Sequence, residues 1–221
     1  MAMTQRVFKG SGEIFVREHS DSKPFPAPAD IENITQEEFA AIAAYLVEIK
    51  KAENELGYIK NGYTFTETMT AVSDAPDLGQ MRVDDISEET ASNAFALFNA
   101  NGETIKKMHP LARTGTEGTS GFRLTSVGGI KNKNDASYDM LFVHSDTVNG
   151  DICIFTVGKN VEGLTLQFQP TTVTPLPVTY AAQAIDNTGT LAHVIELPVG
   201  FDWATGQVKG ASTQTTSNLA D

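Results

Sequence analysis

The sequence predicts a mainly β, antiparallel fold, either a β-sandwich or a β-barrel. Segments rich in Val, Ile, Thr, Tyr and Phe recur along the chain with alternating apolar positions. Turn residues separate these segments, and connections of roughly 5–10 residues are too short for the helical crossovers of a parallel sheet. The chain has 221 residues, 40% of them hydrophobic, so it can form one domain with a packed core.

Alternation along the chain predicts the individual strands. The first covers 10–17, where apolar residues occupy both faces. The other segments predicted as strands are 57–72, 80–86, 122–127, 138–145, 151–157, 164–169, 176–184 and 190–196. Turn residues at 74–78 and glycines at 158–163 predict tight connections between neighbouring strands.

Threonine marks one face of the predicted strand 57–72. Four threonines alternate with other residues there, which predicts a long strand with a Thr-rich face. Asn61-Gly62 supplies turn chemistry near its beginning. The threonines are Thr64, Thr66, Thr68 and Thr70.

A Pro-rich loop and a helix precede this strand. Three prolines within 24–28 predict an extended loop. Thr35 and Glu38 then fit a capping box, and apolar residues at helical spacing predict a helix over 36–47. The stretch 46–49 could also begin a strand.

A second helix is predicted over 87–98. Ser87 is suited to cap it, and Glu88 and Glu89 would lie in its first turn. Asn and Gly residues within 99–102 would end it. Its apolar stripe is Ala91, Ala94, Phe95 and Phe98.

The domain organisation follows from composition. Residues 1–203 are predicted to form one β domain, in which the Pro-rich loop and helix of 20–55 are an insertion. Residues 204–221 are rich in Ser, Thr and Gly, so we expect a flexible C-terminal arm.

Acidic residues dominate the charge. The net charge is −12, and the span 30–89 holds 14 acids against four basic residues. Such a field repels nucleic acid and anionic membranes, which argues against specific DNA binding. The longest apolar run, 39–47, is too short to cross a bilayer, and the first residues lack the apolar segment of a secretory signal. We therefore expect the protein to be made in the cytoplasm.

No motif in the sequence indicates catalysis, a cofactor or a metal. The single cysteine, Cys153, lies in an apolar run and is expected to be buried, and the four histidines lack the spacing of zinc ligands. The glycine pairs at 10–12 and 158–163 do not continue as phosphate-binding loops. Asp84, Asp85, Glu88 and Glu89 lack the spacing of a calcium loop and are interpreted as the solvated start of a helix.

The segment 56–108 resembles the tail tube (major tail) proteins of long-tailed bacteriophages, in particular those of phages and prophages of Gram-positive hosts. The matching residues are LGYIKNG at 56–62, the DLG turn at 77–79, the acidic step at 84–89 and NGETIKKM at 101–108. FVHSDTVNGDICIFTVGKNVEGLTLQFQP at 142–170 and VTYAAQAIDNTGTL at 178–191 are also similar to that family. The loop and helix of 20–50 and the tail beyond 203 depart from its pattern.

The resemblance implies a structural protein of the virion tail and no enzyme. Tail tube subunits are β-sandwich or barrel domains with a short helix, a long insertion loop and terminal arms. They assemble in the host cytoplasm into hexameric rings that stack into a tube, together with tail tip, tape-measure and tail terminator proteins. DNA passes through the lumen without specific binding, and no membrane or cofactor takes part.

An anionic lumen would not retain DNA phosphates, so part of the acidic span is expected to face the lumen or the next ring. The candidate acids are Glu53, Glu55, Glu67, Asp74, Asp77, Asp84 and Asp85. The inner tube of a contractile tail or of a tail-like bacteriocin fits the sequence equally well. A monomeric carbohydrate-binding β-sandwich is a rival, although its usual exposed aromatics are represented by one tryptophan, Trp203. An enzyme built on a β-sandwich is a third alternative.

Overall fold

The structure is a computed structural model that describes residues 12–74, 83–98, 101–115, 121–166 and 175–209. These residues form eleven strands, two α-helices and two short 3₁₀ helices, which loops connect. The helices are α1 (Gln36–Ile49), η1 (Ala52–Asn54), α2 (Gly102–Met108) and η2 (Ile130–Asn132). The strands are β1 (Glu13–Glu18), β2 (Glu55–Asp74), β3 (Val83–Leu97), β4 (Ala112–Thr114), β5 (Thr125–Val127), β6 (Tyr138–His144), β7 (Ile152–Asn160), β8 (Leu176–Gln183), β9 (Ala192–Glu196), β10 (Phe201–Asp202) and β11 (Gln207–Val208).

The main sheet closes into a barrel. Its strands follow the order β6-β1-β2-β3-β8-β7, and β6 pairs with β7 as well as with β1. Strand β9 adds to the first half of β7, whose second half pairs with β8. All these pairings are antiparallel, which confirms the predicted mainly β, antiparallel fold.

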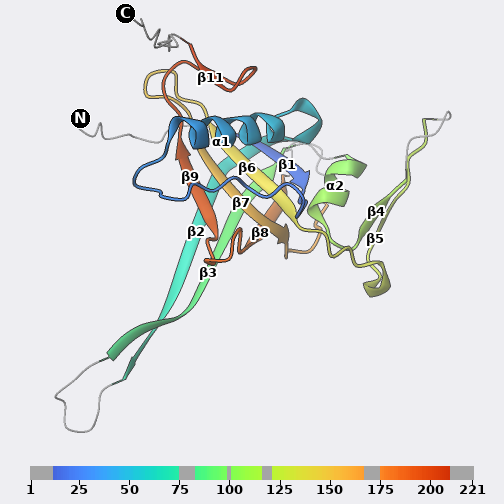
Figure 1. Cartoon of the computed structure of the whole chain (residues 1–221). Helices are drawn as coiled ribbons and strands as arrows, with labels where there is room; N and C mark the ends of the chain where they lie inside the picture. The colour runs from blue at the N-terminus through green and yellow to red at the C-terminus, as the bar shows by residue number, and fades with distance from the viewer. Residues whose placement is uncertain (1–11, 75–82, 99–100, 116–120, 167–174, 210–221) are drawn as a thin grey trace, which may run out of the picture.

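Alternating side chains divide the core into two parts. Along β6, Tyr138, Met140 and Phe142 point into the barrel, where they meet apolar residues of β1, β3 and β8. The intervening Leu141 and Val143 point outward and pack under α1. The barrel therefore has an apolar interior and a second apolar layer between its wall and the helix. Figure 1 shows α1 lying across the outside of the barrel.

The first helix confirms its prediction and continues to Ile49. Thr35 caps it, and the side chain of Glu38 accepts a hydrogen bond from the Thr35 backbone, so the capping box is complete. Ile42, Leu46 and Ile49 are buried against the barrel wall. The stretch 46–49 is therefore the end of the helix and does not begin a strand.

The Pro-rich loop packs back against the domain. Phe25 is buried and stacks on Phe155 of β7 and His193 of β9, with ring centroids 4.8 and 4.5 Å apart. The ring of Tyr45 from α1 meets Phe25 edge-on at 5.4 Å. This aromatic cluster ties the loop, the helix and the barrel together.

A buried carboxylate joins α1 to the barrel. Asp139 of β6 has no solvent exposure and accepts hydrogen bonds from Arg17 (2.6 Å) and from the hydroxyl of Tyr45 (2.9 Å). His19 Nδ1 lies 2.6 Å from its other oxygen. Burial and the neighbouring carboxylate raise the pKa of Tyr45, so its hydroxyl remains a donor.

The second predicted helix is wrong, because residues 87–98 belong to strand β3 and its end. Along this segment Ala91, Asn93, Phe95 and Leu97 are buried, which is the two-residue period of a strand. The pair Ala91 and Phe95 also fits a helical spacing of four, so the local pattern is ambiguous. The segment forms a strand because it pairs with β2 on one side and with β8 on the other.

Helix α2 was not predicted. Asn101 caps it by accepting a hydrogen bond from the backbone N–H of Thr104 at 2.9 Å. The Asn and Gly residues that were predicted to end a helix therefore begin one, because Asn is also a favoured N-cap.

Several predicted turns and strands differ in the structure. Asn61-Gly62 lies within β2, where the pairing with β3 shifts between Lys60 and Tyr63. Gly158 lies within β7 and not in a turn; a Cβ there would overlap the carbonyl oxygen of Ala181 on β8. Glycine is required because the two backbones approach closely.

Some boundaries are only partly described. Residues 164–166 form no strand, while 167–169 of that prediction lie outside the described residues, as do most of the turn 74–78 and the start of the strand 80–86. Residues 204–209 form the turn and second strand of the β10–β11 hairpin, although they were assigned to the tail. The remaining tail residues, 210–221, lie outside the described part.

We expect Asp139→Ala to lower the free energy of unfolding by about 3 kcal/mol, because it removes the acceptor of Arg17 and Tyr45 from a buried site. Urea denaturation measures the change. Asp21→Ala is the matched control, since this exposed carboxylate also neighbours His19, at 3.5 Å; its effect should stay within about 0.5 kcal/mol. Equal unfolding midpoints for the two variants would contradict the assigned role of Asp139.

Candidate functional site

A long hairpin formed by β2 and β3 projects beyond the barrel (Figure 1). Strand β1 pairs with β2 only as far as Tyr58, and β8 pairs with β3 only from Ser92 onward. Beyond these points, the described residues of β2 and β3 pair with each other and with no other described strand. The outer part of the hairpin is therefore a two-stranded ribbon whose outer edges carry unpaired backbone groups.

A chain of hydrogen-bonded polar side chains anchors the base of the hairpin. Tyr63 donates a hydrogen bond to Asn93 Oδ1 at 2.5 Å, and Asn93 donates in turn to Thr156 of β7 at 3.0 Å. The ring of Tyr63 stacks on Phe142 with centroids 3.9 Å apart. Burial raises the pKa of Tyr63, so the hydroxyl stays neutral. These contacts hold the hairpin at a defined angle to the barrel.

One face of the hairpin carries small hydroxyl side chains, as predicted. Thr66 lies opposite Ser92 and Thr68 opposite Thr90, while Thr64 lies opposite Ala94. The four threonines of this face are exposed, and α1 covers a different side of the barrel. This Thr-rich face continues toward the barrel along the outside of β2 and β3.

The opposite face of the hairpin is apolar and acidic. It carries Phe65, Met69 and Ile86 together with Glu67 and Glu89. Met69 is 59% exposed and Ile86 57% exposed, so this face presents large apolar side chains to the solvent.

The seven candidate acids do not form one cluster. Glu53 in η1 and Glu55 at the start of β2 lie at the α1 end of the barrel, and both are exposed. The other described candidates belong to the hairpin. Glu67 and Asp85 are exposed there, Asp74 pairs with Val83, Asp84 pairs with Ser73, and Asp77 lies outside the described residues.

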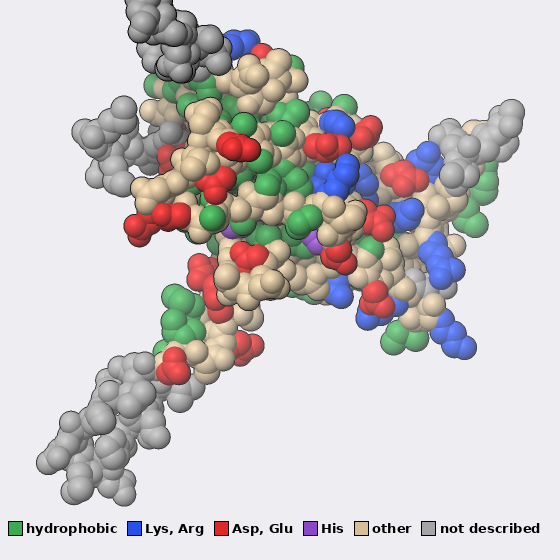
Figure 2. Space-filling model, viewed as in Figure 1, with side chains coloured by type: hydrophobic (Ala, Val, Ile, Leu, Met, Phe, Trp, Pro, Cys, Tyr) green, Lys and Arg blue, Asp and Glu red, His purple; other side chains and the backbone are tan. Residues whose placement is uncertain are grey.

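Charge is distributed unevenly over the surface. Strands β2 and β3 contain seven acidic residues and one lysine. Figure 2 shows acidic side chains along the hairpin and basic ones gathered on the other side of the barrel, over β4 and β5. Glu88 and Glu89 were predicted to lie at the solvated start of a helix, and their place on the hairpin became clear only from the pairing of β3 with β2. The basic surface over β4 and β5 was not predicted.

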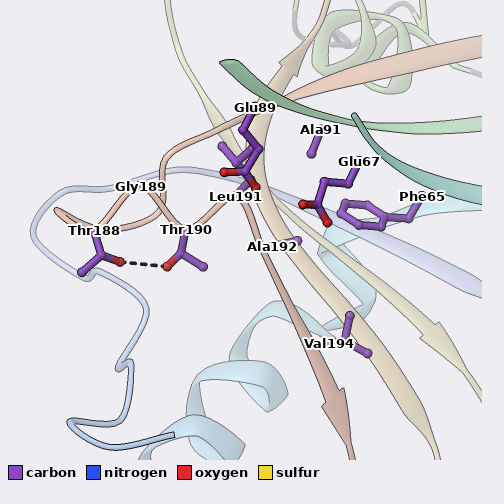
Figure 3. Close-up of a pocket in the computed structure, with 10 residues that line it drawn as sticks. All are labelled: Phe65, Glu67, Glu89, Ala91, Thr188, Gly189, Thr190, Leu191, Ala192 and Val194. Atoms are coloured by element: carbon purple, nitrogen blue, oxygen red, sulfur yellow. Dashed lines mark hydrogen bonds between the residues drawn. The ribbon is translucent and has the colours of Figure 1, made fainter. Parts of the chain in front are cut away.

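A pocket of about 300 Å³ lies where the hairpin meets the segment 188–194. Glu67 and Glu89 project into it from the hairpin, and Phe65 forms one wall (Figure 3). Ala91, Leu191, Ala192 and Val194 supply apolar surface, while Thr188 and Thr190 form the rim. We refer to this space as the hairpin pocket.

The described residues lack a cluster of potential metal ligands. They contain no group of three or more His, Cys, Asp or Glu side chains that could hold a metal ion. Cys153 is fully buried, and burial raises its thiol pKa, which opposes formation of a reactive thiolate. Burial also lowers the pKa of His193, which stacks on Phe25. No described helix is long and apolar enough to span a membrane.

Trp203 does not provide an open platform for a sugar ring. Its indole N–H donates to Asp151 at 2.7 Å, and its ring contacts Phe201 edge-on with centroids 5.1 Å apart. Lys50 lies over the ring at 5.1 Å from its centroid. The tryptophan therefore fastens the C-terminal hairpin and α1 to the barrel.

Neither a protein-family model nor a curated protein matches the chain. The projecting hairpin and the surfaces around it are therefore the features that bear on function.

Cys153 should not react with a thiol reagent in the native protein at mildly alkaline pH, because burial excludes the reagent and raises the thiol pKa. It should react fully in concentrated urea, as measured by absorbance of the released chromophore. Rapid native reaction would show that β7 is accessible, contrary to the structure.

Proposed function

We propose that this protein is a structural subunit of a bacteriophage tail tube. In this proposal, copies assemble into stacked hexameric rings whose lumen conducts DNA. The β2–β3 hairpin is the observation that carries the proposal. It supports self-assembly because an isolated two-stranded ribbon is marginally stable in water, yet here two long strands extend beyond the barrel.

The edges of the hairpin favour another copy of the chain as its partner. Unpaired backbone groups along β2 and β3 can pair with strands of a neighbouring subunit, and a closed ring would leave no edge exposed. The resemblance of 56–108 to tail tube proteins includes most of this hairpin. The resemblance and the geometry therefore favour the same part of the molecule.

The Thr-rich face suits a surface along which DNA moves. Its threonine, serine and alanine side chains are small and uncharged, and the pairing adds Glu88 opposite Thr70 and Asp85 opposite Val72. Lysine or arginine on such a surface would bind phosphates, whereas carboxylates repel them. We assign this face to the lumen, with the tail tip, tape-measure and tail terminator proteins as partners of the assembled tube in the virion.

The inner tube of a contractile tail is the alternative of the same class, and a sheath protein would then surround the tube. A carbohydrate-binding module gains no support from Trp203, whose polar group and ring are both engaged.

Shortening the hairpin should abolish assembly and leave the barrel folded. The variant removes residues 69–89 and joins Thr68 to Thr90, its partner in the ladder, through Asn-Gly. Negative-stain electron microscopy and analytical ultracentrifugation should show tubes or rings for the wild type and monomers for the variant. Both should have the same unfolding midpoint. Tubes formed by the shortened variant would refute the role of the hairpin.

Replacing Asp85 and Glu88 with lysine should make assembled tubes retain short duplex DNA, because phosphates would bind the lumen. Co-sedimentation of fluorescent DNA with the tubes measures the effect, which should decrease with added salt. Lysine at Glu53 and Glu55, at the α1 end of the barrel, is the control with the same change of charge. Equal retention by both pairs of variants would contradict the assignment of the lumen face.

A further inference from the structure

The hairpin pocket combines apolar walls with uncompensated negative charge. Glu67 and Glu89 are its charged lining residues, and neither forms an ion pair with a described residue. Glu67 on β2 lies opposite Ala91 on β3, and Glu89 is two residues from Ala91. The two glutamates are therefore diagonal neighbours on the same face of the hairpin. Like charges at this spacing repel each other, so a cationic group between them would be stabilising.

A surface of complementary character lies on the β4–β5 arm, by which we mean residues 112–115 and 121–127. Its two strands pair from Ala112–Val127 to Thr114–Thr125, and Gly115 donates a backbone hydrogen bond to Leu124 at 3.0 Å. Phe122 and Leu124 are 69% and 62% exposed. Arg113 is also exposed and forms no ion pair with a described residue.

The ladder puts apolar and basic groups of the arm on one side. Arg113 lies opposite Ser126, and Leu124 is two residues before Ser126, so Arg113 and Leu124 share a face. The arm thus presents a guanidinium beside a large aliphatic side chain. A guanidinium can lie between two carboxylates, and the leucine can contact apolar walls such as those of the pocket.

The arm and the pocket of one chain cannot meet. In Figure 1 the β4–β5 arm and the β2–β3 hairpin project from opposite sides of the barrel. A contact between them must therefore join two molecules, and it would use a different surface on each. Such a heterologous contact repeats from one copy to the next and produces a ring or a filament.

We propose that the hairpin pocket of one subunit receives the β4–β5 arm of a second copy of this chain. In this contact Arg113 lies between Glu67 and Glu89, and Leu124 packs against Val194 and Phe65. The proposal rests on the proposed function in that both require self-association, and it specifies which two surfaces meet.

Disulfide trapping tests this contact directly. Val194→Cys places a thiol in the pocket and Leu124→Cys places one on the arm, while the native Cys153 is buried and contributes little background. After mild oxidation, a mixture of the two full-length variants should give a disulfide-linked dimer. Val148→Cys is the matched control, because this valine is 77% exposed and belongs to neither surface. A yield from Val194→Cys no higher than that from Val148→Cys would overturn the proposal.

Charge reversal tests the chemistry of the contact. Arg113→Glu in the Leu124→Cys chain should lower the cross-linking yield at least about fivefold, because it brings a third carboxylate to the pocket. Glu67→Arg with Glu89→Arg in the Val194→Cys chain should restore it. An unchanged yield after Arg113→Glu would refute the pairing of Arg113 with these glutamates.

The two proposals can fail separately. Wild-type tubes without the Val194–Leu124 cross-link would refute this contact and leave the tube proposal standing. The cross-link in a protein that forms closed dimers or other assemblies without a lumen would support the contact and refute the tube.

Discussion

Strand β6 pairs along its length with both β1 and β7, and this double pairing turns a twisted sheet into a closed barrel. Closure satisfies the backbone hydrogen bonds of the central strands and shields the apolar side chains between them. It also determines where backbone groups stay unpaired. Among the described strands of the barrel, β2 and β3 extend furthest beyond their neighbours, so their edges are available to another chain.

The helix side of the barrel has a different role from the hairpin side. Apolar residues of α1, the aromatic cluster around Phe25 and the hydrogen bonds of Asp139 cover one part of the outer wall. The Thr-rich face lies elsewhere, and no described helix or loop covers it in this way. Few contacts with the rest of the described chain constrain the outer part of the hairpin. The proposed self-assembly would therefore use the hairpin for contacts and the helix side as a rigid body.

Local patterns predicted the elements whose residues fit one period. The capping box of Thr35 and Glu38, the Thr-rich face and the alternation along β6 and β7 all agree with the structure. The helix prediction for 87–98 failed because Ser87 and two glutamates resemble the start of a helix. In addition, Ala91 and Phe95 fit both the helical and the strand period. This segment forms a strand because it pairs with β2 and β8. A rule that considers only neighbouring residues in the sequence cannot detect such pairing. The hairpin pocket was equally hidden, since the residues 188–194 and 65–91 meet only after the barrel closes.

The order of the strands also has a kinetic consequence. Residues of β1 and β6 that share the barrel wall are far apart in sequence, as Arg17 and Asp139 are, at a separation of 122 residues. The β2–β3 ladder is local by comparison and can form while the rest of the chain is still being synthesised. A nascent chain would then expose this ribbon before it has a barrel to hold it. The carboxylates along β2 and β3 would keep such ribbons apart by mutual repulsion, and thereby reduce aggregation during synthesis.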